Sequence, residues 1–160
     1  MEIGVKYGLL AGAARVVLFV ALFFISKEWM LSYSAYYLSV FLVLVAMYLA
    51  TRTEGETAES YPTQAALRTA FLTFVVANGV FYSFYYIIHQ IDPGLAEIQK
   101  QMARDFYPMI TPKDQLDQVL SDLDKTDFTL TLSQTLFRYA RSLIAGFILA
   151  AGIGYVTRRN

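Results

Sequence analysis

The sequence contains no cysteine and only one histidine, His89, among its 160 residues. Without cysteine the chain forms no disulfide, thiolate zinc site or iron–sulfur cluster, and a single histidine leaves little for metal chemistry. Charged residues are scarce as well. The 13 Lys and Arg balance the 13 Asp and Glu, so the formal net charge is zero. A chain with no basic excess is not expected to bind nucleic acid.

Apolar side chains dominate what is present: 56% of the residues are hydrophobic and 16% are charged. This composition is typical of a membrane protein. A helix needs about 20 mainly apolar residues to cross a bilayer. Four runs meet this need, and they predict spanning helices at residues 7–26, 31–51, 69–88 and 136–157. The sequence therefore predicts an all-α polytopic integral membrane protein with four transmembrane helices in a single domain, residues 1–160.

The connections between these helices are expected to differ in length. A tight turn at 26–30 follows the first helix, and a short polar loop at 52–61 follows the second. All four prolines of the chain lie outside the proposed spans, as expected for helices whose backbone groups are bonded internally. The first helix has no small-residue cleavage site after it, so we expect a retained helix and not a signal peptide.

Residues 89–134 form the only sizeable segment between spans, and we expect an external helical insertion there. Asp92 before Pro93 is a helix-start signal, and Pro108 is expected to end that helix. Thr111 before Pro112 repeats the signal as a second N-cap. Apolar residues then recur at helical spacing in both stretches, which predicts a short amphipathic helical pair. Its apolar stripes either pack on each other or lie on the membrane surface.

An even number of crossings places both termini on one side of the membrane. Five basic residues flank the spans on that side: Lys6, Arg52, Arg68, Arg158 and Arg159. The opposite side has Lys27 in its short turn and the long segment, where eight acidic residues outnumber four basic ones. The excess of Lys and Arg near the spans predicts that both termini are cytoplasmic and that 89–134 lies outside.

Three arginines fall within the predicted spans and are candidate contacts for an anion or a lipid headgroup. Arg15 lies in the first span, where a cation costs a few kcal/mol, about 2.5–3.5 on insertion scales. The alternative is that Arg15 snorkels to the cytoplasmic interface or bonds to Asn78 or to backbone carbonyls. Arg138 and Arg141 are three residues apart on one helical face, where headgroup contact is favoured over a paired anion clamp.

Small residues recur at four-residue spacing in both terminal helices. The first stripe is Gly4, Gly8 and Gly12, and the second is Gly146, Ala150 and Gly154. Such stripes let another helix approach closely, and they are predicted to be helix-packing faces. Contacts within the monomer and contacts with a partner both remain open.

No catalytic or metal-binding constellation emerges from the sequence. Asp122, Asp124 and Asp127 loosely resemble a calcium loop, but Asp127 stands where glycine is needed and Ser133 where a bidentate glutamate is needed. A solvated helix face is the preferred interpretation. His89 has no second histidine or cysteine to join it as a ligand, and is expected to be an interfacial polar cap. We therefore expect no enzyme activity and no cofactor.

Four segments resemble a known family: Lys6 to Gly12 (Lys-Tyr-Gly-Leu-Leu-Ala-Gly), Tyr61 to Phe71, the aromatic end of the third span followed by Ile91 to Gly94, and the glycine-rich last helix that ends at Asn160. The family is the small four-helix membrane proteins of Bacteroidota known as domain of unknown function 4199 (DUF4199). The resemblance covers nearly the full chain. It implies a bacterial inner-membrane protein and assigns no functional residue, because the family has no established chemistry.

Together these features favour a non-enzymatic accessory or interaction subunit of an inner-membrane complex. Its expected partners are the lipid bilayer and either another membrane protein or further copies of the same chain. The alternative is a small transporter or carrier of an anionic or lipid ligand, with Arg15, Asn78, Arg138 and Arg141 along its path. Uninterrupted spans without membrane-embedded carboxylates argue against the carrier.

Overall fold

The computed structural model describes residues 1–158, and the seven elements in this range are all α-helices. Four of them are long and apolar enough to cross a membrane: α1 (Ile3–Ile25), α3 (Tyr33–Thr57), α4 (Thr63–Ile91) and α7 (Leu132–Thr157). The others are the short α2 (Lys27–Leu31), α5 (Gly94–Ile110) and α6 (Lys113–Lys125). The chain is thus an all-α polytopic membrane protein, as predicted.

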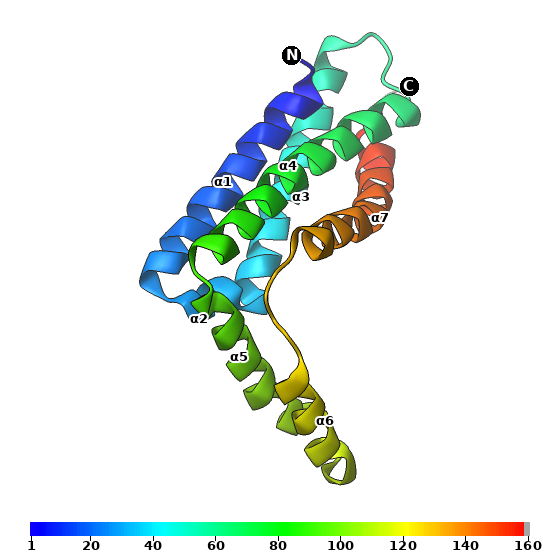
Figure 1. Cartoon of the computed structure of the whole chain (residues 1–160). Coiled ribbons are helices and arrows are strands. Elements are labelled where there is room, and N and C mark those ends of the chain that lie inside the picture. The colour runs from blue at the N-terminus through cyan, green and yellow to red at the C-terminus, as the bar shows by residue number, and fades with distance from the viewer. Residues whose placement is uncertain (159–160) are drawn as a thin grey trace.

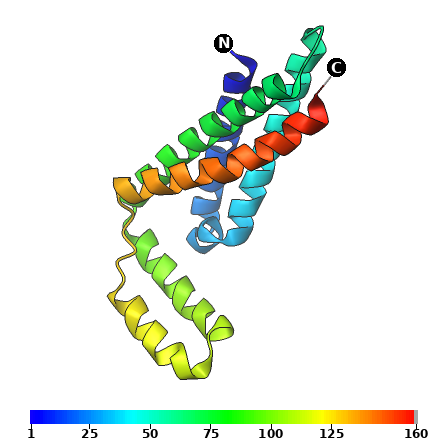
Figure 2. The ribbon, with the colours of Figure 1, turned by 90° about the vertical axis from the view of Figure 1, so that its right-hand side faces the viewer.

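The four long helices form one bundle with α4 packed against the other three, and α3 also contacts both α1 and α7 (Figures 1 and 2). Helix α1 begins and α7 ends at the same end of this bundle, here called the termini end. At the opposite end, helices α5 and α6 form a hairpin that projects away from the bundle. We call this the hairpin end.

The bundle has two buried clusters, one toward each end. Toward the termini end, small side chains from α1, α3, α4 and α7 surround two large ones, Met47 and Phe74. Toward the hairpin end, larger side chains meet: Phe19, Met30, Ala35, Phe81 and Leu95. The rings of Phe19 and Phe81 make an edge-to-face contact with centroids 4.9 Å apart, a favoured aromatic geometry. Small residues therefore allow close helix packing toward the termini end, and aromatic rings fill the space between the helices toward the hairpin end.

The long helices begin or end several residues away from the predicted limits. Helix α3 continues to Thr57, so the polar loop predicted at 52–61 was wrong in its first half. Arg52 and Glu56 form an ion pair one turn apart with Nε and Oε1 separated by 3.0 Å, and such pairs extend a helix beyond the apolar span. Helix α4 begins directly after Pro62, and α7 begins at Leu132 behind a capping box made by Thr131 and Gln134.

The external segment also differs in detail. Pro108 lies inside the last turn of α5, so the prediction that it ends the helix was wrong by two residues. The N-cap position of α6 is Pro112, one residue after the predicted cap Thr111, and no side chain makes a cap hydrogen bond there. The N-cap position of α5 is Pro93, and the Asp92 side chain accepts a hydrogen bond from the N–H of Gly94, the first residue of the helix, at 3.0 Å. The turn predicted at 26–30 contains the short helix α2, capped by Ser26.

Candidate functional site

Arg15 is buried in the middle of the bundle. It lies in α1 about 15 to 18 Å from either helix end, at 1.5 Å rise per residue, and only 1% of its surface is exposed. Its Nη1 donates a hydrogen bond to Oδ1 of Asn78 in α4 over 2.8 Å. Its guanidinium also lies over the Phe81 ring, with Cζ 3.8 Å from the ring centroid. Arg15 therefore does not snorkel to the interface, and Asn78 is its partner.

Asn78 is held in place to receive this hydrogen bond. Its Nδ2 donates to the carbonyl oxygen of Phe74, one turn earlier in α4, over 3.1 Å, which leaves Oδ1 directed at Arg15. One hydrogen bond and one ring satisfy only part of a guanidinium with five N–H groups. Within residues 1–158 the Nε and Nη2 atoms of Arg15 have no hydrogen-bond partner and no carboxylate pairs with it. Arg15 is thus a buried cation without a counter-charge.

A cavity of about 310 Å³ lies beside Arg15 at the hairpin end of the bundle. Its wall is mostly aromatic and comes from α1, α2, α3, α4 and α7: Phe19, Met30, Leu31, Ser32, Tyr33, Tyr36, Tyr37, Phe81, Tyr82, Tyr85 and Arg138. Phe81 links the two features, since its ring lines the cavity and also contacts the Arg15 guanidinium. Aromatic pockets with a few convergent polar groups are the usual form of a ligand site.

The two arginines of α7 have different surroundings. Arg138 lines the cavity, whereas Arg141, one turn further along α7, does not. Both side chains are exposed on the surface of the bundle. None of the ion pairs in the described part of the chain involves either residue. The structure therefore brings Arg138 together with the cavity near Arg15 and leaves Arg141 outside it.

Sequence reasoning missed the tyrosines of this cavity. Tyr36, Tyr82 and Tyr85 belong to the aromatic belts that mark the ends of spanning helices, and such residues are usually interpreted as headgroup anchors. Their spacing carried a second signal, because residues 81, 82 and 85 recur at helical intervals on one side of α4. Phe81 contacts both Tyr82 and Tyr85, with ring centroids 5.7 Å apart in each case.

The small-residue stripe of α1 lies against α4. A Cβ atom added to Gly4 would approach the Thr69 carbonyl oxygen at 3.0 Å, and one added to Gly8 would lie 2.7 Å from Val76 Cβ. The same distance separates a Cβ at Gly12 from Val80 Cβ. Side-chain atoms do not approach that closely without a shift of the helices. The stripe is therefore occupied by contacts within the chain.

The stripe of α7 lies against the other side of α4. A Cβ at Gly146 would overlap the Phe74 ring, and one at Gly154 would lie 2.8 Å from the backbone nitrogen of Leu67. Ala150 between them is fully buried in the core. Both stripes thus allow the close helix approach that stabilises packing in lipid.

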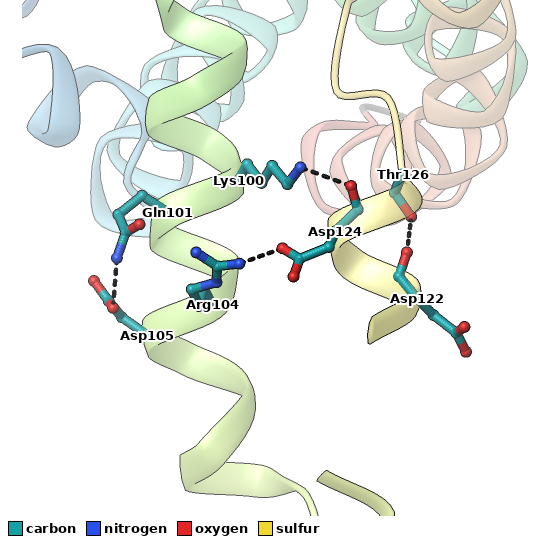
Figure 3. Close-up of polar contacts among 7 residues, drawn as sticks. All are labelled: Lys100, Gln101, Arg104, Asp105, Asp122, Asp124 and Thr126. Carbon is teal, nitrogen blue, oxygen red and sulfur yellow. Dashed lines mark hydrogen bonds and ion pairs between the residues drawn. The ribbon is translucent and has the colours of Figure 1, made fainter. Parts of the chain in front are cut away.

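The α5–α6 hairpin is held together by polar contacts on the two facing helices (Figure 3). Arg104 of α5 forms an ion pair with Asp124 of α6. Lys100, one turn earlier in α5, donates to the Asp124 backbone oxygen over 2.9 Å. Helices α5 and α6 contact each other, and Leu123 of α6 is buried. At the start of α5, Leu95 and Ile98 pack instead on the aromatic cluster at the hairpin end of the bundle.

The base of the hairpin is fastened to the bundle at two points. Lys27 of α2 forms an ion pair with Asp92 at the start of α5, and this hydrogen-bonded contact lowers the pKa of the Asp92 carboxyl below its ordinary value. His89, predicted as an interfacial cap, is instead buried, with Nδ1 2.8 Å from the Tyr85 carbonyl oxygen. Gln99 of α5 donates to the Tyr85 hydroxyl over 3.0 Å. Tyr85 thereby connects the cavity wall with the hairpin.

A second polar cluster closes the α3–α4 connection at the termini end. Glu54 accepts hydrogen bonds from the hydroxyl groups of Tyr61, over 3.0 Å, and of Thr69. Tyr61 is buried against Gly55, and this burial raises the pKa of its hydroxyl to about 12. The cluster joins the end of α3 to the start of α4, which is a structural role. Residues 1–158 contain no group of three or more His, Cys, Asp or Glu side chains placed to hold a metal ion.

These observations define a class: a four-span helical membrane protein with an external helical hairpin. The family model described as "Protein of unknown function (DUF4199)" matches residues 6–159, nearly the whole chain. The chain belongs to this family, as the resemblance predicted. No curated protein and no solved structure matches it.

Proposed function

We propose that the protein is a non-enzymatic accessory subunit of a complex in the bacterial inner membrane, and that its α5–α6 hairpin binds the partner. The observation that carries this proposal is the apolar tip of the hairpin. At the end of α5, the exposed fractions of Phe106, Met109 and Ile110 are 47%, 79% and 60%. An apolar patch on a projecting, water-exposed element marks an interaction surface.

The glycine stripes support this assignment by exclusion. Both stripes are covered by α4 in the same chain, so they offer no surface to another subunit. The hairpin is well suited to binding because its two helices are joined by Arg104 and Asp124 and its base is fastened by Lys27 and Asp92. A pre-ordered surface loses little conformational entropy when a partner binds. The partner is a membrane protein with an exposed apolar site, or a second copy of this chain.

The hairpin proposal predicts that Met109→Asp lowers recovery of the partner at least about tenfold, because one apolar anchor in an interface contributes ~2 kcal/mol or more. The measurement is quantitative mass spectrometry of material that co-purifies in mild detergent after cross-linking in native membranes. Ser121→Asp is the matched control, since it adds the same charge at an exposed position of α6 away from the tip. Equal partner recovery from both variants contradicts the proposal.

The orientation proposed with this function has the termini in the cytoplasm and the hairpin outside. The chain has no cysteine, so single cysteines can be introduced without background. Ser60→Cys in the α3–α4 connection and Ser121→Cys in α6 are expected to label from opposite sides, with Ser121→Cys reached by an impermeant reagent in intact cells. The basic residues that flank the spans at the termini end are the physical reason. Labelling of Ser60→Cys from outside overturns this orientation.

A second candidate function, a carrier of an anionic or lipid ligand, is favoured by one observation: the cavity lined by Arg138 next to buried Arg15. The four long helices run without an internal proline. Carriers commonly interrupt their helices at the binding site. A binding site in the cavity does not require transport, and the accessory role remains the preferred function.

A further inference from the structure

We propose that the cavity at the hairpin end is a binding site for one anionic lipid, whose phosphate contacts Arg138 and whose acyl chains lie among the aromatic rings. This inference goes beyond the accessory function, since it concerns the bundle and not the hairpin tip. A lipid site and a partner site can each exist without the other.

The position of the cavity is the first observation in favour of a lipid. Arg138 is two residues inside the apolar span predicted at 136–157, and Tyr85 is three residues inside the one predicted at 69–88, so both lie about 3 to 5 Å from the hairpin-end limit of the apolar segments at 1.5 Å per residue. Tyr33 and Tyr37 on the rim are exposed. This is the depth at which lipid phosphates and glycerol esters meet the hydrocarbon region. A lipid can therefore enter the cavity sideways from the adjacent leaflet.

The charge around the cavity is the second observation, and it favours an anionic occupant. Arg138 is in its wall, and Arg15 lies behind the Phe81 ring that lines it. Neither arginine is paired with a carboxylate in the described part of the chain. No Asp or Glu is among the residues that line the cavity. Two cations with no nearby anion, in a medium that screens charge poorly, favour a negatively charged occupant.

The side chains that line the cavity are the third observation, and they favour a lipid over a small soluble anion. Apart from Arg138 and Ser32, the wall consists of aromatic and aliphatic side chains. The Ser32 hydroxyl already donates to the Trp29 carbonyl oxygen over 2.7 Å. A free phosphate has Arg138 and the tyrosine hydroxyl groups to contact, but it leaves the rings and the aliphatic side chains of the wall without an apolar occupant, and burial of that apolar surface is favourable. An amphiphile presents its phosphate to Arg138 and its chains to the rings.

The test is native mass spectrometry of the full-length protein after reconstitution in vesicles of equal phosphatidylglycerol and phosphatidylcholine. The expected result is one retained phosphatidylglycerol per chain. Arg138→Gln should weaken this binding about tenfold or more, the usual effect of losing a hydrogen bond to a charged group. Arg141→Gln is the matched control, because it removes an exposed arginine one turn away that does not line the cavity. It should leave binding unchanged.

Three outcomes overturn the proposal. Equal loss with both variants means that lipid is attracted by surface charge and not by the cavity. Equal retention of phosphatidylcholine means that the cavity does not select an anion. Displacement of the lipid by inorganic phosphate means that the site takes a soluble anion. Because Arg138 is exposed and lies outside both core clusters, its replacement does not threaten folding. Met109→Asp should leave lipid binding intact, which separates a failure of this site from a failure of the hairpin function.

Discussion

Gly8→Leu should lower the free energy of unfolding by about 3 kcal/mol, the upper end of the usual cost of overpacking a core. The reason is the closeness of α1 and α4. The first added carbon would lie 2.9 Å from the Thr73 carbonyl oxygen, a backbone atom that cannot move aside without displacing α4. Thermal unfolding in detergent, followed by circular dichroism, measures the effect.

Gly152→Leu is the matched control for this prediction. Gly152 belongs to the same kind of helix but has nothing within 4 Å of an added Cβ atom, and it faces outward. Leucine there removes the helix penalty of glycine, roughly 1 kcal/mol, and should leave the melting temperature unchanged or raise it. If Gly8→Leu melts like Gly152→Leu, then α1 and α4 do not pack as closely as described.

The four spanning helices were predictable because the bilayer itself sets their length. An uncharged run of about 20 residues has few alternatives to a helix in lipid, where every backbone group must be bonded internally. The limits of the helices were less predictable, since they depend on contacts outside the bilayer. Helix α3 extends past its apolar run because Arg52 pairs with Glu56 and because Glu54 binds Tyr61 of the following connection.

The surroundings of Arg15 illustrate what the sequence could contribute to the candidate site. Its depth in the first span and the scarcity of polar side chains elsewhere in the spans made Asn78 a candidate partner. The choice between that partner and snorkelling depends on the register between α1 and α4, which follows from the fit of Gly8 and Gly12 against Val76 and Val80. Sequence periodicity identifies the glycine stripe but not the residues that cover it.

The cavity was beyond sequence reasoning for a different reason. Its lining comes from five helices, and it depends on the position of Arg138 in α7 relative to the residues from Met30 to Tyr37 in α2 and α3. Local patterns on one helix carry no information about that arrangement. The tyrosines at the ends of α3 and α4 have the same sequence signature whether they face lipid headgroups or a pocket.

Asn78→Leu and Arg15→Met should change stability in opposite directions. Asn78→Leu removes the only hydrogen-bond acceptor that Arg15 has within residues 1–158. A buried cation is then left without compensation, which should cost about 3 kcal/mol or more. Arg15→Met removes the charge itself and keeps an unbranched side chain of similar length. Replacement of a buried ion pair by apolar groups of similar volume is commonly neutral or stabilising by ~1–4 kcal/mol, and here the loss of the donor to the buried Asn78 Oδ1 offsets part of that gain.

The double variant, which combines Arg15→Met with Asn78→Leu, removes the charge and its partner together. It should regain most of the stability lost in Asn78→Leu, since leucine and methionine then fill an apolar space at the α1–α4 contact. All four proteins are compared by thermal unfolding in the same neutral, lipid-free detergent, so that a bound anion does not stabilise the parent. If Arg15→Met destabilises the protein more than Asn78→Leu does, the guanidinium contributes packing against Phe81 that outweighs its cost of burial. In that case Arg15 stabilises the empty bundle through its ring contact, and the energetic reason for an anion near it disappears.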